Sequence, residues 1–316
     1  MRRAALLAWR LHRFELRILL VAAALLVVAS LVIAWQTRVV RADELACYAA
    51  APPPVEGSTG STCPQFNDAT ALLESGRRLA SGATTVSPFV LGLFLGVPLV
   101  AREIESGTAP IAWTLARSRA RWLVQRAAPV LVGTLLVASA IAGTGELLTA
   151  VAPWNEGVDP GFQDFGGRGP LLVVRGVAVL GIGLAAGALI GRQLPALLVA
   201  GLVVLALMIG LTIYTDQLMR REAEPIEMRA MQGAALSKVY GSGFRDDATG
   251  EIIGFDEYYA RPDAVNVEEP PGMTPVLFAV PGERYRDFVL RESAIFGAVT
   301  VVMGSGAWLI VRRRSP

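Results

Sequence analysis

The sequence predicts an all-α polytopic membrane protein with six transmembrane helices. Hydrophobic residues make up 53% of the 316 residues, and only 18% are charged. The apolar residues gather in repeated runs of about 18–25 residues, which is the length that crosses a bilayer as a helix. The basic residues lie mainly at the ends of these runs. With a net charge of only +2, this distribution argues against a nucleic-acid partner.

The amino-terminal segment, residues 1–17, is rich in arginine and places Leu7, Leu11 and Phe14 at helical spacing. This pattern predicts an amphipathic helix at the membrane interface, with its arginines toward anionic lipid. The alternative is a plain positive flank that orients the first span. That span, residues 18–35, is longer than the apolar part of a signal peptide, so we expect an uncleaved anchor.

Residues 36–83 are polar and rich in proline, glycine and serine, and we expect them to form an outer loop. They contain both cysteines of the chain, Cys47 and Cys63. The positive-inside rule places the amino terminus in the cytoplasm and this loop outside, where a disulfide persists. A Cys47–Cys63 disulfide is therefore predicted, and two free cysteines are the alternative.

Glycines four residues apart mark two of the remaining spans. Small residues at this spacing let helix backbones approach closely, so these faces are expected to pack on other helices. The glycines are Gly92, Gly96, Gly183, Gly187 and Gly191. The five spans are residues 84–101, 129–151, 170–191, 195–215 and 294–311.

Two ionisable residues, Glu146 and Arg175, are expected within spans three and four, at similar depth near the outer side. Intramembrane charges usually pair with each other or line a cavity. Three interpretations stay open: Glu146 pairs with Arg175, Arg175 reaches the outer headgroups, or the two line a substrate path.

A long outer segment, residues 216–290, separates spans five and six and predicts a small α+β insertion. Residues 246–255 (DDATGEIIGF) are similar to a β-hairpin, with Gly250 as the turn residue between two short strands. Its acidic residues lack the spacing of an EF-hand loop and indicate a solvated face. Residues 291–316 supply span six and a basic tail ending in Arg312, Arg313 and Arg314, a stop-transfer pattern that places both termini in the cytoplasm.

The chain contains one lysine, Lys238, and one histidine, His12. Lys238 has no glycine-rich lead, which excludes a P-loop of the usual form. A single histidine leaves little from which to build a histidine metal site or a Ser–His pair.

The connection between spans two and three, residues 102–127, is where we expect function. Glu103 and Glu105 suit the start of a helix, and Pro110 is expected to break or kink it midway. The basic side chains that follow could meet acidic groups of a partner or inner-leaflet lipid; they are Arg117, Arg119, Arg121 and Arg126. Ile104, Thr108, Ile111 and Leu115 recur at i, i+4, i+7 and i+11, so they lie on one face of the helix. This face could enter a groove on a partner.

These residues resemble the cytoplasmic signature of ABC-2-type exporter permeases. A span ends in Arg102 and Glu103, Gly107 and Thr108 follow, and a basic segment leads to the next span. The sequence is most similar to that of actinobacterial permeases in four short segments: PLVARE (98–103), ESGT (105–108), AWT (112–114) and RARW (119–122). The opening AWRLHRFELR (8–17) is also similar. The outer segment 216–290 is longer than in simple members.

The resemblance implies a transport subunit without a catalytic residue, cofactor or metal of its own. A separate ABC ATPase, which binds ATP and Mg²⁺, would dock on the connection as on a coupling helix. A second permease chain would complete the transporter in the membrane lipid. The residues that the resemblance assigns to coupling are Arg102, Glu103, Glu105, Gly107, Thr108, Ile111, Trp113, Arg117 and Arg119.

Mostly apolar spans with glycine suit an amphipathic or lipid-like substrate or drug. A membrane sensor or assembly protein, whose outer segments bind a partner, is the alternative function. A membrane-embedded enzyme would need converging nucleophiles, acids or metal ligands at membrane depth. The spans supply only Glu146, Arg175 and scattered Ser and Thr for that purpose.

Overall fold

The computed structural model describes residues 2–50, 63–116, 118–151, 162, 165–228, 236–261 and 270–314, with the side chains of 2–16, 236 and 237 outside this description. Two compact units make up the chain. The first comprises Met1–Ala152, Gly166–Leu207 and Ser293–Pro316, and the second comprises Pro153–Phe165 and Met208–Glu292.

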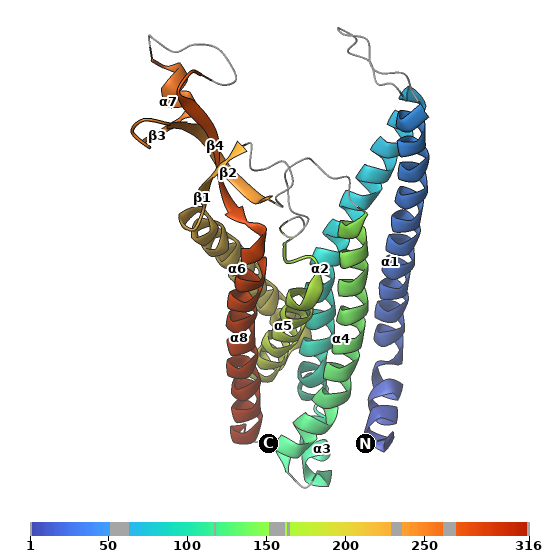
Figure 1. Ribbon diagram of the computed structural model, residues 1–316. Coiled ribbons are helices and arrows are strands. Elements are labelled where there is room, and N and C mark those ends of the chain that lie inside the picture. Colours follow the sequence, from blue (N-terminus) through green and yellow to red (C-terminus); the bar gives the residue numbers. More distant parts are fainter. Residues whose placement is uncertain are drawn as a thin grey trace. The chain divides into compact units, whose positions relative to one another are not determined.

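Among the described residues, six helices are long and apolar enough to cross a membrane, and each overlaps one predicted span (Figure 1). The predicted fold class is therefore confirmed. The helices are α1 (Arg2–Ala50), α2 (Asn67–Glu105), α4 (Arg119–Ala150), α5 (Gly169–Ile190), α6 (Gln193–Arg221) and α8 (Tyr285–Arg313). Shorter elements are η1 (Pro64–Phe66), α3 (Ala109–Leu115), α7 (Phe255–Tyr259) and η3 (Gly282–Arg284).

The first two helices extend beyond the limits that the sequence predicts. No break separates residues 1–17 from the first span, since α1 is one helix from Arg2 to Ala50. The predicted outer loop, 36–83, is helical over most of its length, because α1 continues to Ala50 and α2 begins at Asn67. Polar composition suggested a loop there. The segments are nevertheless rich in Ala, Leu, Glu and Arg, which favour helix in water as well as in lipid.

The predicted glycine faces meet where α2 packs on α5. A Cβ on Gly96 would lie 2.7 Å from the Leu180 carbonyl oxygen, and a Cβ on Gly187 would lie 2.6 Å from that of Val97. Gly92 and Gly183 lie in the same contact. Only glycine lets the two backbones come this close. The fifth glycine, Gly191, instead follows the last turn of α5 with φ +71°, the left-handed conformation that glycine adopts readily.

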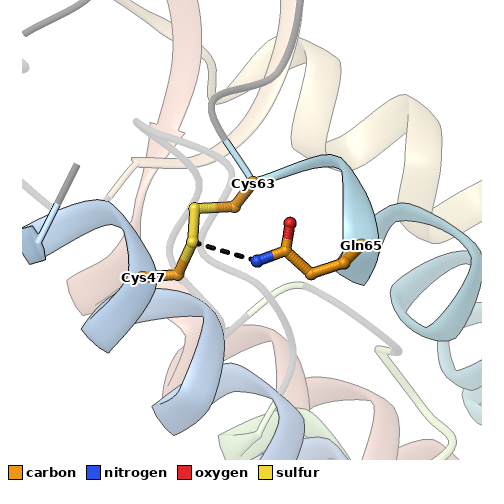
Figure 2. The surroundings of a disulfide bond; sticks show 3 residues. All are labelled: Cys47, Cys63 and Gln65. Carbon is orange, nitrogen blue, oxygen red and sulfur yellow. Dashed lines mark hydrogen bonds between the residues drawn. A yellow bond between two sulfur atoms is a disulfide. The ribbon is translucent and has the colours of Figure 1, made fainter. Parts of the chain in front are cut away.

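Cys47 and Cys63 form a disulfide that joins the end of α1 to the residue before η1 (Figure 2). The Gln65 side-chain amide donates to Cys47 Sγ at 3.3 Å. The bond closes the α1–α2 pair at the end opposite to the α2–α4 connection.

Replacing both cysteines by serine is expected to destabilise the α1–α2 pair by about 3 kcal/mol, the chain-entropy value for a loop of this length. Thermal unfolding of the purified protein in mild detergent measures the loss. Native protein treated with a reductant should reproduce it. Equal melting temperatures for the native, reduced and double-serine proteins would show that the bond contributes nothing.

The second unit contains an antiparallel four-stranded sheet in the order β1-β4-β2-β3. The predicted hairpin is confirmed: β2 and β3 flank a turn in which Gly250 has φ +72°. Phe244 is fully buried beside Phe255 and Tyr258, with ring centroids 4.5 and 4.8 Å apart. The strands are β1 (Glu224–Glu227), β2 (Leu236–Asp246), β3 (Ile252–Gly254) and β4 (Met273–Pro281).

Asp246 stabilises this turn in its charged form. The backbone N–H groups of Thr249 and Ala248 donate to Asp246 Oδ1 at 2.9 and 2.8 Å. These bonds hold the pKa of the carboxyl below its ordinary value of 3.8. Because the folded pKa lies below the unfolded one, the stabilisation is complete above the unfolded pKa and is lost as the pH falls through the folded pKa.

We therefore expect the amide protection factor of Gly250, whose N–H donates to the Asp246 carbonyl at 2.8 Å, to fall below about pH 4. Hydrogen exchange, normalised to an unstructured peptide, measures it. The variant Asp246→Asn should have lower protection that does not change over the same range. A pH dependence identical in the variant would assign the titration to another group.

Candidate partner-docking site

The connection between α2 and α4 lies at the end of the first unit where α1 begins and α8 ends (Figure 1). Helix α2 ends at Glu105, the backbone turns at Gly107 with φ +68°, and α3 begins at Ala109. The prediction of one helix interrupted midway at Pro110 is wrong. Pro110 lies in the first turn of α3, where the missing N–H has no partner to lose.

Glu103 and Glu105 lie in the last turn of α2, so the prediction that they begin a helix is also wrong. An anion is unfavourable at a helix carboxyl terminus, and both side chains have partners that offset this. Glu103 forms an ion pair with Arg126 of α4. Glu105 Oε2 accepts a hydrogen bond of 2.9 Å from the backbone N–H of Gln193, so its charge meets the amino terminus of α6.

Two tryptophans fix α3 to the start of α4. Trp113 and Trp122 meet edge to face with centroids 6.1 Å apart. Arg119 Cζ lies 4.9 Å from the Trp113 ring centroid, and Arg126 Cζ lies 5.3 Å from that of Trp122. Both tryptophans are buried with residues of α2, α3, α4, α5 and α8, namely Val100, Ala109, Leu123, Ala188, Ala307 and Val311. Trp113 is thus an anchor of α3 and contributes little to its outer surface.

The outer surface of α3 is apolar. Ile111 and Leu115, one turn apart, are 64% and 84% exposed. Thr108 and Pro110 are exposed beside them. Ile104, predicted to continue this face, is half-buried against the tryptophan cluster on the α2 side of the turn. Two large aliphatic side chains held outward on a short rigid helix are typical of a contact surface.

The other predicted coupling residues have different positions. Thr108 Oγ1 donates to the Glu103 carbonyl oxygen at 3.3 Å and closes the turn around Gly107. Arg102 is exposed on α2. Arg119 Nη1 donates to the carbonyl oxygen of Arg314, the residue that follows α8. Arg117 lies outside the described residues.

Three residues at this end have roles that their sequence patterns do not predict. Arg126 was expected to face a partner or lipid, but it pairs with Glu103. Arg314 was interpreted only as part of a stop-transfer tail, but it donates to the Ala188 carbonyl oxygen at 2.5 Å. Gln193 carried no signal, since its contribution is a backbone N–H.

The family model described as "ABC-2 membrane transporter related" matches residues 18–215, well over half of the chain. The chain belongs to this family. Its members are membrane subunits of ABC transporters, so the six apolar helices are those of a multi-pass membrane protein. Comparisons with curated proteins and with solved structures return no match. The matched range includes the α2–α4 connection and ends before the sheet.

At the other end of this ABC-2 family protein, Glu146 and Arg175 have different partners, so the Glu146–Arg175 pair, one of the three open interpretations, does not form. Glu146 forms an ion pair of 3.0 Å with Arg168. Arg175 Nη1 donates to the Gly166 carbonyl oxygen at 2.8 Å, and its Cζ lies 5.7 Å from the Phe296 ring centroid. Arg175 is buried, which opposes the interpretation that it extends outward. Arg168 lies before the predicted span, so depth in the membrane does not indicate it as the partner of Glu146.

Within the described ranges, no group of three or more His, Cys, Asp or Glu side chains could hold a metal ion.

Proposed function

We propose that the chain is the permease subunit of an ATP-driven exporter and that a separate ATPase, with ATP and Mg²⁺, docks on α3. The observation that carries this proposal is the construction of α3. Exposed Ile111 and Leu115 form its outer face, and buried Trp113 fixes its inner face to the bundle. A helix built in this way can transmit force, because it cannot shift relative to the spans without breaking buried contacts.

The contacts around α3 support a mechanism for coupling. The Glu103–Arg126 pair connects α2 to α4, and the Glu105–Gln193 bond connects α2 to α6. A displacement of α3 by the ATPase therefore moves the ends of three spans together. The close α2–α5 contact moves as one body with them. Access to a cavity between two permease chains would alternate by this rigid-body motion.

The disulfide supports an orientation. Cys47 and Cys63 lie at the end of the α1–α2 pair opposite to α3, and a disulfide persists in an oxidising compartment. This end is then outside the cell, and α3, both termini and the arginine-rich tail lie in the cytoplasm. A cytoplasmic α3 is accessible to an ATPase.

The substrate class that we propose is amphipathic or lipid-like. The helices present apolar side chains outward, among them Leu198 and Leu202 of α6 and Val301 of α8. These faces contact lipid or a second permease chain, and a substrate entering between them would meet few polar groups.

Purification of the tagged chain in mild detergent tests the proposal. A P-loop ATPase should co-purify with the native chain. It should be lost from the variant Ile111→Glu/Leu115→Glu, which places two charges on the outer face of α3. The control Leu72→Glu/Leu79→Glu carries the same charges on exposed positions in the first half of α2 and should retain the ATPase. Absence of an ATPase from all three samples would contradict the proposal.

The alternative is a membrane sensor or assembly protein, and the four-stranded sheet of the second unit favours it. It predicts that deletion of the sheet, and not charges on α3, abolishes capture of the partner.

A further inference from the structure

Arg314, the residue that follows α8, connects two other elements at the end of the bundle that contains α3. Its Nη1 donates to the Ala188 carbonyl oxygen at 2.5 Å. Ala188 lies in the last turn of α5, where carbonyl groups lack helical partners and a cation is favoured. The backbone carbonyl of Arg314 accepts from Arg119 Nη1, at the start of α4.

The end of α5 is shaped to receive this side chain. Gly191 has φ +71°, and a Cβ there would lie 2.7 Å from Arg314 Nη2 and 2.8 Å from Ile104 Cγ2. Any other residue at position 191 would displace the guanidinium or the end of α2. Both partners therefore contribute to the contact: Arg314 supplies the hydrogen bond, and the glycine at position 191 leaves space for the guanidinium. A basic residue that served only as a stop-transfer charge would not require this space.

The path extends to α3 through Arg119. The guanidinium of Arg119 lies 4.9 Å from the Trp113 ring centroid and donates to Arg314. Trp113, Arg119, Arg314 and Ala188 thus form a continuous series of contacts from α3 through α4 and α8 to α5. Hydrogen bonds from a guanidinium are directional, so this series holds a fixed register, whereas the aliphatic contacts around it can slide.

We propose that Arg314 is a positioning residue, which transmits the displacement of α3 to α8 and α5. This inference rests on the proposed function, since it assumes that a partner ATPase moves α3. It assigns to the carboxyl-terminal tail a part in coupling that is separate from docking. The partners of Arg314 described above are Arg119, Ala188 and Gly191, none of which lies on the outer face of α3, so its loss should leave the ATPase bound.

The test uses the complete complex with its ATPase and compares Arg314→Ala with Arg313→Ala. Arg313 is exposed on the same tail, and its replacement removes the same charge. Nitroxide labels at cysteines replacing Leu25 of α1 and Val302 of α8, both exposed, report movement of α8. Labelled chains are diluted with unlabelled ones, and the distance distribution is measured by electron spin resonance without nucleotide and with ATP–vanadate.

We expect the native complex and Arg313→Ala to show the same nucleotide-dependent shift. In Arg314→Ala the ATPase should still co-purify, but the shift should fall to less than half. Arg314→Lys keeps one donor for the Ala188 carbonyl and should restore part of it. This partial rescue would not follow from a general loss of structure.

Three results would overturn the inference while the proposed function stands: an unchanged shift in Arg314→Ala, an equal loss in Arg313→Ala, or loss of the ATPase from Arg314→Ala. Absence of an ATPase from the native chain would overturn the proposed function itself, so the two failures are distinguishable.

Discussion

Gly96→Ala and Gly187→Ala are expected to destabilise the protein more than other single methyl additions in the spans. Each new Cβ would lie within 2.7 Å of a backbone carbonyl oxygen on the facing helix. A backbone atom cannot rotate away as a side chain can, so α2 and α5 must separate along their contact. Overpacking of this kind costs about 1–3 kcal/mol per site. Denaturation by sodium dodecyl sulphate from mild detergent micelles measures the free energy of unfolding.

The matched control is Gly133→Ala in α4, which also adds one methyl group to a helical glycine. A Cβ at position 133 meets nothing within 4 Å, so the change should be neutral or slightly stabilising, since alanine favours helix over glycine. Unfolding of Gly96→Ala and Gly133→Ala at the same detergent concentration would contradict the close contact of the α2 and α5 backbones at Gly96.

Glu103→Ala is expected to lower transport more than tenfold, on the scale of coupling energies, while all six spans stay inserted. Glu103 and Arg126 have side chains that are only 13% and 19% exposed. Removing one partner leaves the other charge buried, which typically costs about 3–5 kcal/mol. The end of α2 should then separate from α4, and α3 loses one side of its support. Transport of a fluorescent amphipathic dye by the complex with its ATPase in proteoliposomes measures the effect.

The exchange Glu103→Arg/Arg126→Glu provides the control for charge alone. It restores opposite charges in the same place, so it should recover part of the transport that Arg126→Glu alone abolishes. Full transport in Glu103→Ala would remove this pair from the coupling path. An exchange variant no better than either single change would show that the pair acts through something other than its attraction.

The spans could be predicted from sequence because each depends on local composition alone. About 20 apolar residues without charge have few alternatives to a membrane helix. The turn at Gly250 was predicted for a similar reason, since the preference for positive φ belongs to the glycine itself. The extent of α1 and α2 beyond the spans was missed because polar composition does not distinguish a solvated helix from a loop.

The contacts of the candidate site were beyond the sequence because their partners lie far apart along the chain. Glu105 bonds to Gln193, 88 residues away, through a backbone group that carries no side-chain signal. Arg119 and Arg314 are separated by 195 residues. Near the other end, Arg168 rather than Arg175 pairs with Glu146. Arg175 was expected at a depth in the membrane similar to that of Glu146. Which guanidinium reaches the Glu146 carboxylate, however, depends on the conformation of the turn before α5, which contains Arg168.

The central claim is that a partner ATPase binds the outer face of α3, and site-specific photocross-linking tests it most directly. Benzoylphenylalanine is placed at Leu115, which is 84% exposed on α3, or at Leu79, which is 77% exposed in the first half of α2. Irradiation of whole cells should yield a covalent adduct with a P-loop ATPase from position 115 and none from position 79. An ATPase adduct from position 79 alone, or from neither position, would contradict the claim.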